Sequence, residues 1–348
     1  MKKIFFSVVA IAALAACTKS EVAYEPTDEI GFMAVAGNMT KAPISGTTYP
    51  TSLDLYVNAF TSDATDAPNY FTDILFTHKA DNKWGGVPSQ YWPNETALYF
   101  SGYSKSGSFT SASYVPSTDK LTINEYAPGV GTDFGANDLM WFPKTEAYTR
   151  ERGKNGVTAN MYHTCSWITF MIQGDETTGT STSTYKITSL KMNGLDLTAK
   201  VVCTGDADLS QNTLSTYVVW SDNVEQTESY IVTVPADGVS LASTYTSESS
   251  KAPKNLETNA TTTTGGNIVV IPQKPGSIDL AWTYKSTTTA DIPDSATGLS
   301  LKLNDDNTLN WEPGKHYVYT ITIKANEILI APTPVDWVND VNHGVTVE

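Results

Sequence analysis

The chain has 348 residues and a formal net charge of −15, because Asp and Glu outnumber Lys and Arg by 37 to 22. A chain with this net negative charge is not held on nucleic acid or on an anionic membrane surface by electrostatic attraction. The length predicts two domains of ordinary size. Abundant Thr, Ser, Tyr and Val, interrupted often by Gly and Pro, are typical of an all-β protein.

The N-terminus predicts a lipoprotein signal peptide. Lys2 and Lys3 precede a short apolar run, and small residues lead from that run to Cys17. This order is typical of a secretory signal that ends at a lipid-modified cysteine. We expect removal of residues 1–16, which moves the formal charge from −15 to −17, and acyl chains such as palmitate on Cys17. The alternative is an ordinary signal peptide with a chance cysteine.

An apolar strand and a solitary lysine come next. Residues 30–36 have two apolar faces, with Ile30, Phe32, Ala34 and Ala36 on one and Met33 and Val35 on the other. Such a strand needs cover on both sides. The loop after it holds Lys41, whose nearest basic neighbours are Lys19 and Lys79. Lys41 is either an ordinary solubilising side chain or the site of a protease cut before Ala42.

Several short runs of alternating apolar and polar residues predict half-buried antiparallel strands. They span residues 53–60, 96–103, 160–172, 185–192, 228–234, 267–273, 277–284 and 316–323. Residues 133–142 predict a helical turn. The charged, glycine-containing segment 149–156 predicts a boundary between an N-terminal domain of residues 42–152 and a C-terminal domain of residues 153–325.

Two cysteines remain after processing, Cys165 and Cys203, each in a strand-like run. A disulfide is permitted outside the cytoplasm, and two buried free thiols are the alternative. No CxxC or HxxxH spacing predicts a zinc site.

No pattern of catalytic residues is present. The four histidines lie far apart in the sequence, at His78, His163, His316 and His343. No nucleophile elbow, HExxH or phosphate-binding loop occurs, and the acidic residues 304–307 predict a tight turn. We therefore expect no catalytic residue, no metal site and no cofactor, and an extracellular hydrolase is the weakest alternative.

The tryptophans leave two interpretations open. Most lie in or beside strand-like runs, at Trp84, Trp92, Trp167, Trp282, Trp311 and Trp337. Large aromatic side chains usually fill cores, whereas several exposed, coplanar rings would form a platform for sugars. Burial of these rings would favour a structural protein over a glycan-binding surface lipoprotein.

The C-terminal tail, residues 326–348, carries a second set of strand anchors. Its apolar residues are Ile328, Ile330, Val335, Trp337, Val341, Val345 and Val347. An extended apolar segment of this kind fits a groove that has an unpaired sheet edge. Pro332 and Pro334 lack a backbone N–H, and we expect them to discourage the tail from pairing with its own domain.

Six segments, taken in order, resemble the fimbrillin family, the lipoprotein-derived pilins of type V pili in Gram-negative anaerobes. They read TKA (40–42), QYWPNETALYFSGYS (90–104), NDLMWF (137–142), VTANMYHTCSWITFMI (157–172), WEPGKHYVYTITI (311–323) and IAPTPVDW (330–337). Each motif is weak alone, and their order over most of the chain makes the resemblance specific.

The resemblance implies two tandem transthyretin-like β-sandwich domains with Greek-key topology. It implies an outer membrane lipoprotein, anchored through Cys17, that a trypsin-like Arg/Lys-specific protease cuts between Lys41 and Ala42. Loss of residues 17–41 would open a groove, and the tail of the next subunit would fill it. The resulting pilus of identical or related subunits would support adhesion and biofilm formation. The family often has Arg at the cut, where this chain has Lys41, and a stalk, tip or anchor role stays open.

Overall fold

The computed structural model describes residues 28–36, 49–79, 83–128, 138–174, 183–205, 214–225, 230–232, 234–241, 253–256, 268–286, 290–324 and 328–336. These residues are almost entirely β-structure, as the composition predicts. Their helices are single turns, α1 (Arg150–Gly153), α2 (Leu214–Tyr217) and the 3-10 turn η2 (Pro116–Thr118). In these ranges no helix is long and apolar enough to cross a membrane.

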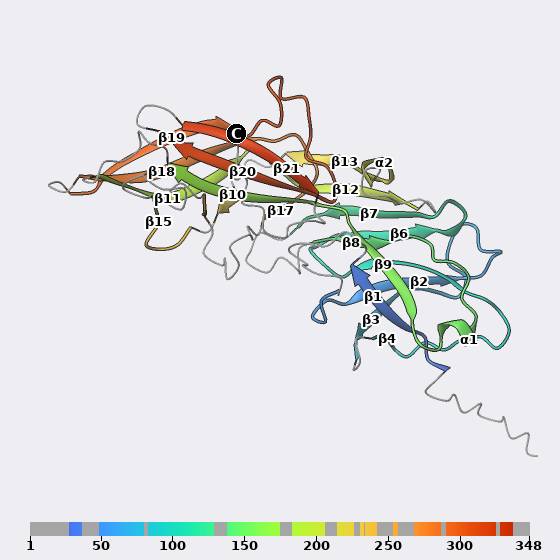
Figure 1. Ribbon diagram of the computed structural model, residues 1–348. Coiled ribbons are helices and arrows are strands. Elements are labelled where there is room, and N and C mark those ends of the chain that lie inside the picture. The colour runs from blue at the N-terminus through green and yellow to red at the C-terminus, as the bar shows by residue number, and fades with distance from the viewer. Residues whose placement is uncertain are drawn as a thin grey trace, which may run out of the picture.

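The N-terminal part is a closed barrel, seen at the lower right of Figure 1. Around the barrel the strands are β1 (Gly31–Ala36), β4 (Trp84–Val87), β3 (Phe71–His78), β2 (Leu55–Phe60), β5 (Tyr99–Ser104), β8 (Met140–Phe142) and β9 (Val157–His163). Alternation along these strands sends one set of side chains inward, and Phe32, Phe76, Trp84 and Phe100 are among those in the barrel core. The barrel closes because β1 pairs with both β4 and β9.

A four-stranded sheet packs against the outside of this barrel. Its strands are β13 (Val218–Glu225), β12 (Asp196–Thr204), β7 (Lys120–Tyr126) and β6 (Ser111–Val115). The core between the two layers combines Tyr103 and Trp141 of the barrel with Leu121 and Val201 of the sheet. The sheet joins the two halves of the chain, because Val201 of β12 pairs with Ile123 of β7.

The C-terminal part is a sandwich of two further sheets. One contains β16 (Lys254–Asn255), β10 (Ser166–Gly174), β20 (Lys315–Ile323), β21 (Ile328–Asp336) and, beside β10, β17 (Ile268–Val270). The other contains β14 (Tyr230–Val232), β11 (Ser183–Asn193), β18 (Ser277–Ser286), β19 (Ile292–Ser300) and, beside β11, β15 (Val239–Ser240). Phe170, Leu280 and Trp311 lie in the core between these sheets.

The sheets do not divide at the boundary predicted between residues 152 and 153. β9 follows that boundary and still belongs to the barrel, and α1 lies within the segment 149–156 that predicts the boundary. The run 160–172, predicted as one strand, divides at Thr164–Cys165 into β9 and β10. Figure 1 shows the chain passing there from the barrel into the sandwich.

Candidate functional site: the first strand and its groove

β1 is the strand on which the expected maturation depends. Ile30, Phe32 and Ala34 are 1%, 0% and 4% exposed, so the face predicted to point inward does so. Met33 and Val35 on the other face are half-buried. The strand is therefore fully covered on one side and partly covered on the other, where the sequence predicts cover on both sides. The side chain of Ala36 lies outside the described residues.

The backbone of β1 is held on both edges. Gly31 and Phe32 pair antiparallel with Gly85 and Trp84 of β4. Phe32 to Ala36 pair in parallel with residues 157–161 of β9. Because both edges are occupied, removal of β1 would leave unpaired backbone groups on β4 and on β9.

The residues just before β1 extend this pairing. The Ile30 amide donates to the Gln90 carbonyl at 2.7 Å, and the Trp92 amide donates to the Asp28 carbonyl at 2.9 Å. The nine residues from Asp28 to Ala36 thus lie in one continuous groove.

An aromatic pocket holds the central anchor, Phe32. The Phe32 ring lies edge-on to Phe76 and Phe100, with centroids 5.0 and 5.2 Å apart, and it is tilted against Phe142 at 5.9 Å. Edge-to-face pairs of this kind add stability beyond the apolar area that they bury. The pocket belongs to β3, β5 and β8, so it would remain in place if β1 left.

An ion pair closes the groove at the start of β1. The Arg150 guanidinium contacts Oδ1 of Asp28, whose side chain is 10% exposed, while that of Arg150 is 44% exposed. α1 fixes the position of Arg150, because Thr149 caps this turn and Gly153 packs against the Trp92 ring with no room for a Cβ. Sequence reasoning missed this pair. The sequence did hold one signal: Asp28 alternates with Ile30 and Phe32, so its side chain is expected on the same inward face of the strand.

β21 occupies the first part of the expected donor tail. It pairs antiparallel with β20 over its whole length, from Ile323 opposite Ile328 to Lys315 opposite Asp336. Ile328 and Ile330 pack partly buried against the sandwich core. The expectation that Pro332 and Pro334 discourage the tail from pairing with its own domain is wrong, because both residues lie within this pairing. Both stand at alternate positions of an edge strand, where a proline nitrogen can face away from the partner strand.

Several predicted residues lie outside the described residues. They are Cys17, Lys41, Ala42, Trp337, Val341, Val345 and Val347, together with the side chain of Val335. The lipid site, the cut and the outer part of the tail therefore stay predictions.

Comparison with known proteins identifies the fold family. A family model described as fimbrillin-like matches residues 40–337. The chain belongs to this family. A solved fimbrial protein from Bacteroides vulgatus is 15% identical, has a TM-score of 0.59, and is matched over 89% of this chain and 99% of its own. A solved structure from Bacteroides uniformis, whose description names a cell adhesion protein, is 12% identical and has a TM-score of 0.48. The match covers 89% of this chain and 99% of that chain. No curated protein sequence matches.

As a member of the fimbrillin-like family, this chain is a pilus-type structural subunit rather than an enzyme. The tryptophans agree with a structural role. Those at most 9% exposed are Trp84, Trp92, Trp141, Trp167, Trp282 and Trp311. Trp220 is half-buried and donates its indole N–H to the Thr164 carbonyl at 2.8 Å. Among the described residues no platform of exposed tryptophan rings exists.

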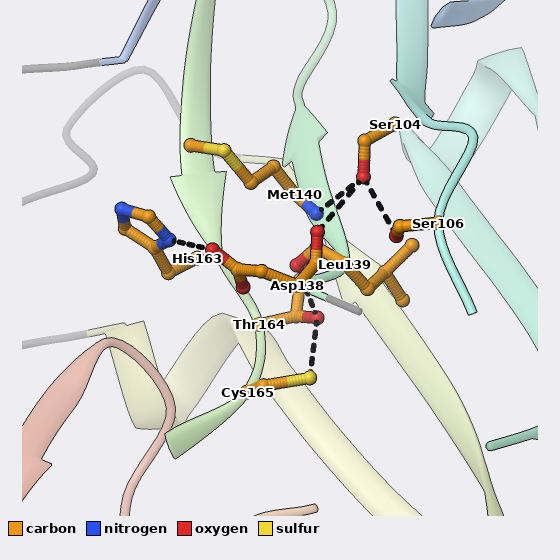
Figure 2. Close-up of polar contacts among 8 residues, drawn as sticks. All are labelled: Ser104, Ser106, Asp138, Leu139, Met140, His163, Thr164 and Cys165. Atoms are coloured by element: carbon orange, nitrogen blue, oxygen red, sulfur yellow. Dashed lines mark hydrogen bonds and ion pairs between the residues drawn. The ribbon is translucent and has the colours of Figure 1, made fainter. Parts of the chain in front are cut away.

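A buried polar network marks the passage from barrel to sandwich in the fimbrillin-like fold (Figure 2). The Asp138 carboxylate contacts Nδ1 of His163 at 2.5 Å, and both side chains are 0% exposed. Ser104 donates to the Asp138 carbonyl at 3.2 Å, and Thr164 donates to the Leu139 carbonyl at 2.8 Å. Full burial leaves no path for a substrate, so the network orients the chain where β9 gives way to β10.

The second buried histidine, His316, is also structural. Its ring stacks on Trp167 with centroids 3.2 Å apart, and its Nε2 lies 2.9 Å from the Thr169 hydroxyl. Burial holds the pKa of His316 well below its usual value, so this ring is neutral at physiological pH. Within the part of the chain that the structure describes, no group of His, Cys, Asp and Glu could hold a metal ion.

Cys165 and Cys203 are both free and buried. They lie in the core between the barrel and the four-stranded sheet. Burial raises the pKa of each thiol above the ordinary range, so neither is a reactive thiolate. Of the two alternatives, the structure has the pair of free thiols.

Proposed function

We propose that the chain is the precursor of a structural pilus subunit that polymerises by protease-triggered donor-strand exchange and supports cell adhesion and biofilm formation. The precursor travels to the outer membrane as a lipoprotein held by a lipid on Cys17. An Arg/Lys-specific protease cuts between Lys41 and Ala42. The cut subunit loses β1, and the C-terminal segment of another subunit takes its place in the barrel.

The observation that carries this proposal is the position of β1. It is a short strand at the start of the described chain, and it closes a barrel that the later strands build. Its inward side chains lie in pockets that other strands provide, among them Phe76, Phe100 and Phe142. A strand held in this way can be exchanged for another without refolding of the remaining strands.

The energetic reasoning supports replacement rather than simple loss. Burial of an apolar side chain such as Ile30 or Phe32 is worth about 1.5–3 kcal/mol each. An empty groove forfeits this stabilisation and also leaves unpaired backbone groups on two strands. A cut subunit without a replacement strand is therefore unstable relative to one that has captured the tail of a neighbour, and this difference drives assembly.

Limited trypsin treatment of the purified precursor tests the proposal. We expect a single early cut with Ala42 as the new N-terminus, followed by fibres that are visible by electron microscopy. A Lys41→Gln variant should remain monomeric under the same treatment. A chain that ends at residue 336 should be cut normally, retain β21 and form no fibres. Fibres from either variant would refute the cut or the tail as the cause of assembly.

A further inference from the structure

A polar cleft opens on the outside of the barrel where β8 and β9 part. In the described part of the chain these two strands pair only at residues 140–141 with 162–163. The chain then leaves β9 and follows β5, where the Thr145 amide donates to the Phe100 carbonyl at 2.8 Å. A cleft of about 650 Å³ lies between β9 and the segment 142–148. This volume is within the range of small-molecule sites, roughly 300–1,000 Å³.

Hydrogen bonds fix the walls of the cleft. Near α1, the Tyr148 hydroxyl accepts from the Thr158 amide at 3.4 Å and so bridges the two sides. Nearer β8, the Asp119 carboxylate accepts from the Lys144 amide at 3.0 Å. Gly205 completes this wall, because a Cβ at that position would overlap the Asp119 carboxylate. The cleft is therefore preformed, which lowers the entropic cost of filling it.

A row of side chains from β9 lines the cleft, namely Thr158, Asn160 and Tyr162. They alternate with Ala159 and Met161, which are buried in the barrel core, so the row lies on the outer face of the strand. Within the residues that the structure describes, the side-chain polar groups of all three make no hydrogen bond. Because the row covers five residues of an extended strand, it spans roughly 13 Å.

The cations of the cleft already have partners. The Arg152 guanidinium pairs with Glu146 and lies over the Tyr148 ring, 4.6 Å from its centroid. The Lys144 ammonium lies over the Tyr99 ring, also at 4.6 Å. Among the described residues of the cleft, neither cation is thus available to a phosphate or a carboxylate. The net charge of −15 on the whole chain disfavours an anionic ligand further.

We propose that this cleft is a binding site for a short neutral oligosaccharide. Sugar hydroxyls both donate and accept hydrogen bonds, as do the Asn160 amide and the hydroxyls of Thr158 and Tyr162. The Tyr162 ring offers an apolar face to the C–H groups of a sugar ring. An apolar ligand would instead bury these polar groups without partners, which costs binding free energy. The site uses a tyrosine in a recessed cleft rather than an exposed platform of tryptophans. It is complete in the uncut precursor and does not depend on strand exchange.

A glycan array followed by isothermal titration calorimetry, both on the uncut precursor, tests the proposal. The array carries lactose, N-acetyllactosamine and maltotriose as neutral probes, together with sialylated and sulfated lactose. We expect binding of at least one neutral probe and no tighter binding of the charged forms. The calorimetric titration of that probe then gives the dissociation constant for the wild type and for each variant.

Three variants locate the site. Asn160→Ala should weaken binding about tenfold, because it removes an amide that both donates and accepts. Tyr162→Phe keeps the ring and should weaken binding about threefold. Asn160→Trp fills the cleft and should abolish binding. Asn223→Ala is the matched control, since Asn223 is an exposed asparagine of a different strand, β13, and its loss should leave binding unchanged. Equal melting temperatures show that each variant is folded.

Each outcome decides the inference. Binding of a neutral probe that depends on Asn160 and Tyr162 but not on Asn223 supports it. No binding of any neutral probe overturns it, as does tighter binding of a sialylated or sulfated form. Binding that persists in Asn160→Trp places the sugar elsewhere and also overturns it. Normal fibre formation by a protein that binds no sugar would contradict this inference and leave the proposed assembly intact.

Discussion

The substitution Phe32→Ala should change the stability of the precursor but not that of the polymer. In the precursor, the Phe32 ring is fully buried against Phe76, Phe100 and Phe142. In the proposed polymer, β1 has gone and the tail of a neighbour occupies the same pocket. Phe32→Ala should therefore destabilise only the precursor. Phe76 belongs to the barrel in both states, so Phe76→Ala should destabilise both and provides the matched control.

The expected magnitude follows from the buried ring. Replacement of a buried Phe by Ala typically costs about 3–5 kcal/mol, which includes the cavity that remains. Two edge-to-face contacts and full burial place Phe32 in the upper part of this range. Urea unfolding of the uncut protein measures the free energy of unfolding. The dissociation temperature of purified, trypsin-treated polymers measures the stability of the polymer.

Two results would refute this reasoning. A polymer of the Phe32→Ala variant that dissociates at a lower temperature than wild type would mean that β1 is still in the groove. A precursor with an unchanged free energy of unfolding would mean that β1 does not hold the barrel closed.

Three further predictions concern the rest of the fold. Pro332→Thr with Pro334→Thr restores two backbone N–H groups on the free edge of β21, so light scattering should show increased self-association of the uncut protein, and an unchanged monomer would contradict the edge role. Because burial lowers the pKa of His316, the unfolded chain binds a proton there below pH about 6.5 that the folded chain does not. The free energy of unfolding should therefore fall as pH decreases below that value, by up to about 1.4 kcal/mol per unit, with a shallower slope in His316→Gln. Cys165 and Cys203 should react with a thiol reagent only after unfolding, and mass spectrometry that finds either labelled in the native protein would contradict their burial.

The sequence predicted local structure better than the assignment of strands to sheets. The alternating runs at residues 53–60, 277–284 and 316–323 correspond to β2, β18 and β20, because a half-buried strand has the same period wherever it lies. The run 160–172 keeps the same alternation through Thr164 and Cys165. The pattern therefore gives no sign that the chain passes there from the barrel into the sandwich. Nothing in a local pattern states that β12 pairs with β7, since that contact joins distant segments.

The candidate site was predictable in part for the same reason. Alternation identified the inward face of β1, and Ile30, Phe32 and Ala34 are buried as expected. It could not identify Arg150 as a partner of Asp28, because that contact depends on how α1 follows β8 and packs against Trp92. The prediction from Pro332 and Pro334 failed for a related reason. A missing N–H disrupts pairing only where that N–H would face the partner strand, and the sequence does not state which way it faces.

The occupant of the barrel groove in the assembled fibre tests the central claim most directly. Cryo-electron microscopy of fibres grown from trypsin-treated protein, at a resolution that shows side chains, would trace the strand between β4 and β9. We predict that this strand connects to β21 of the neighbouring subunit and that no residue before Ala42 is present. A fibre in which β1 of the same chain still lies between β4 and β9 would contradict assembly by strand exchange.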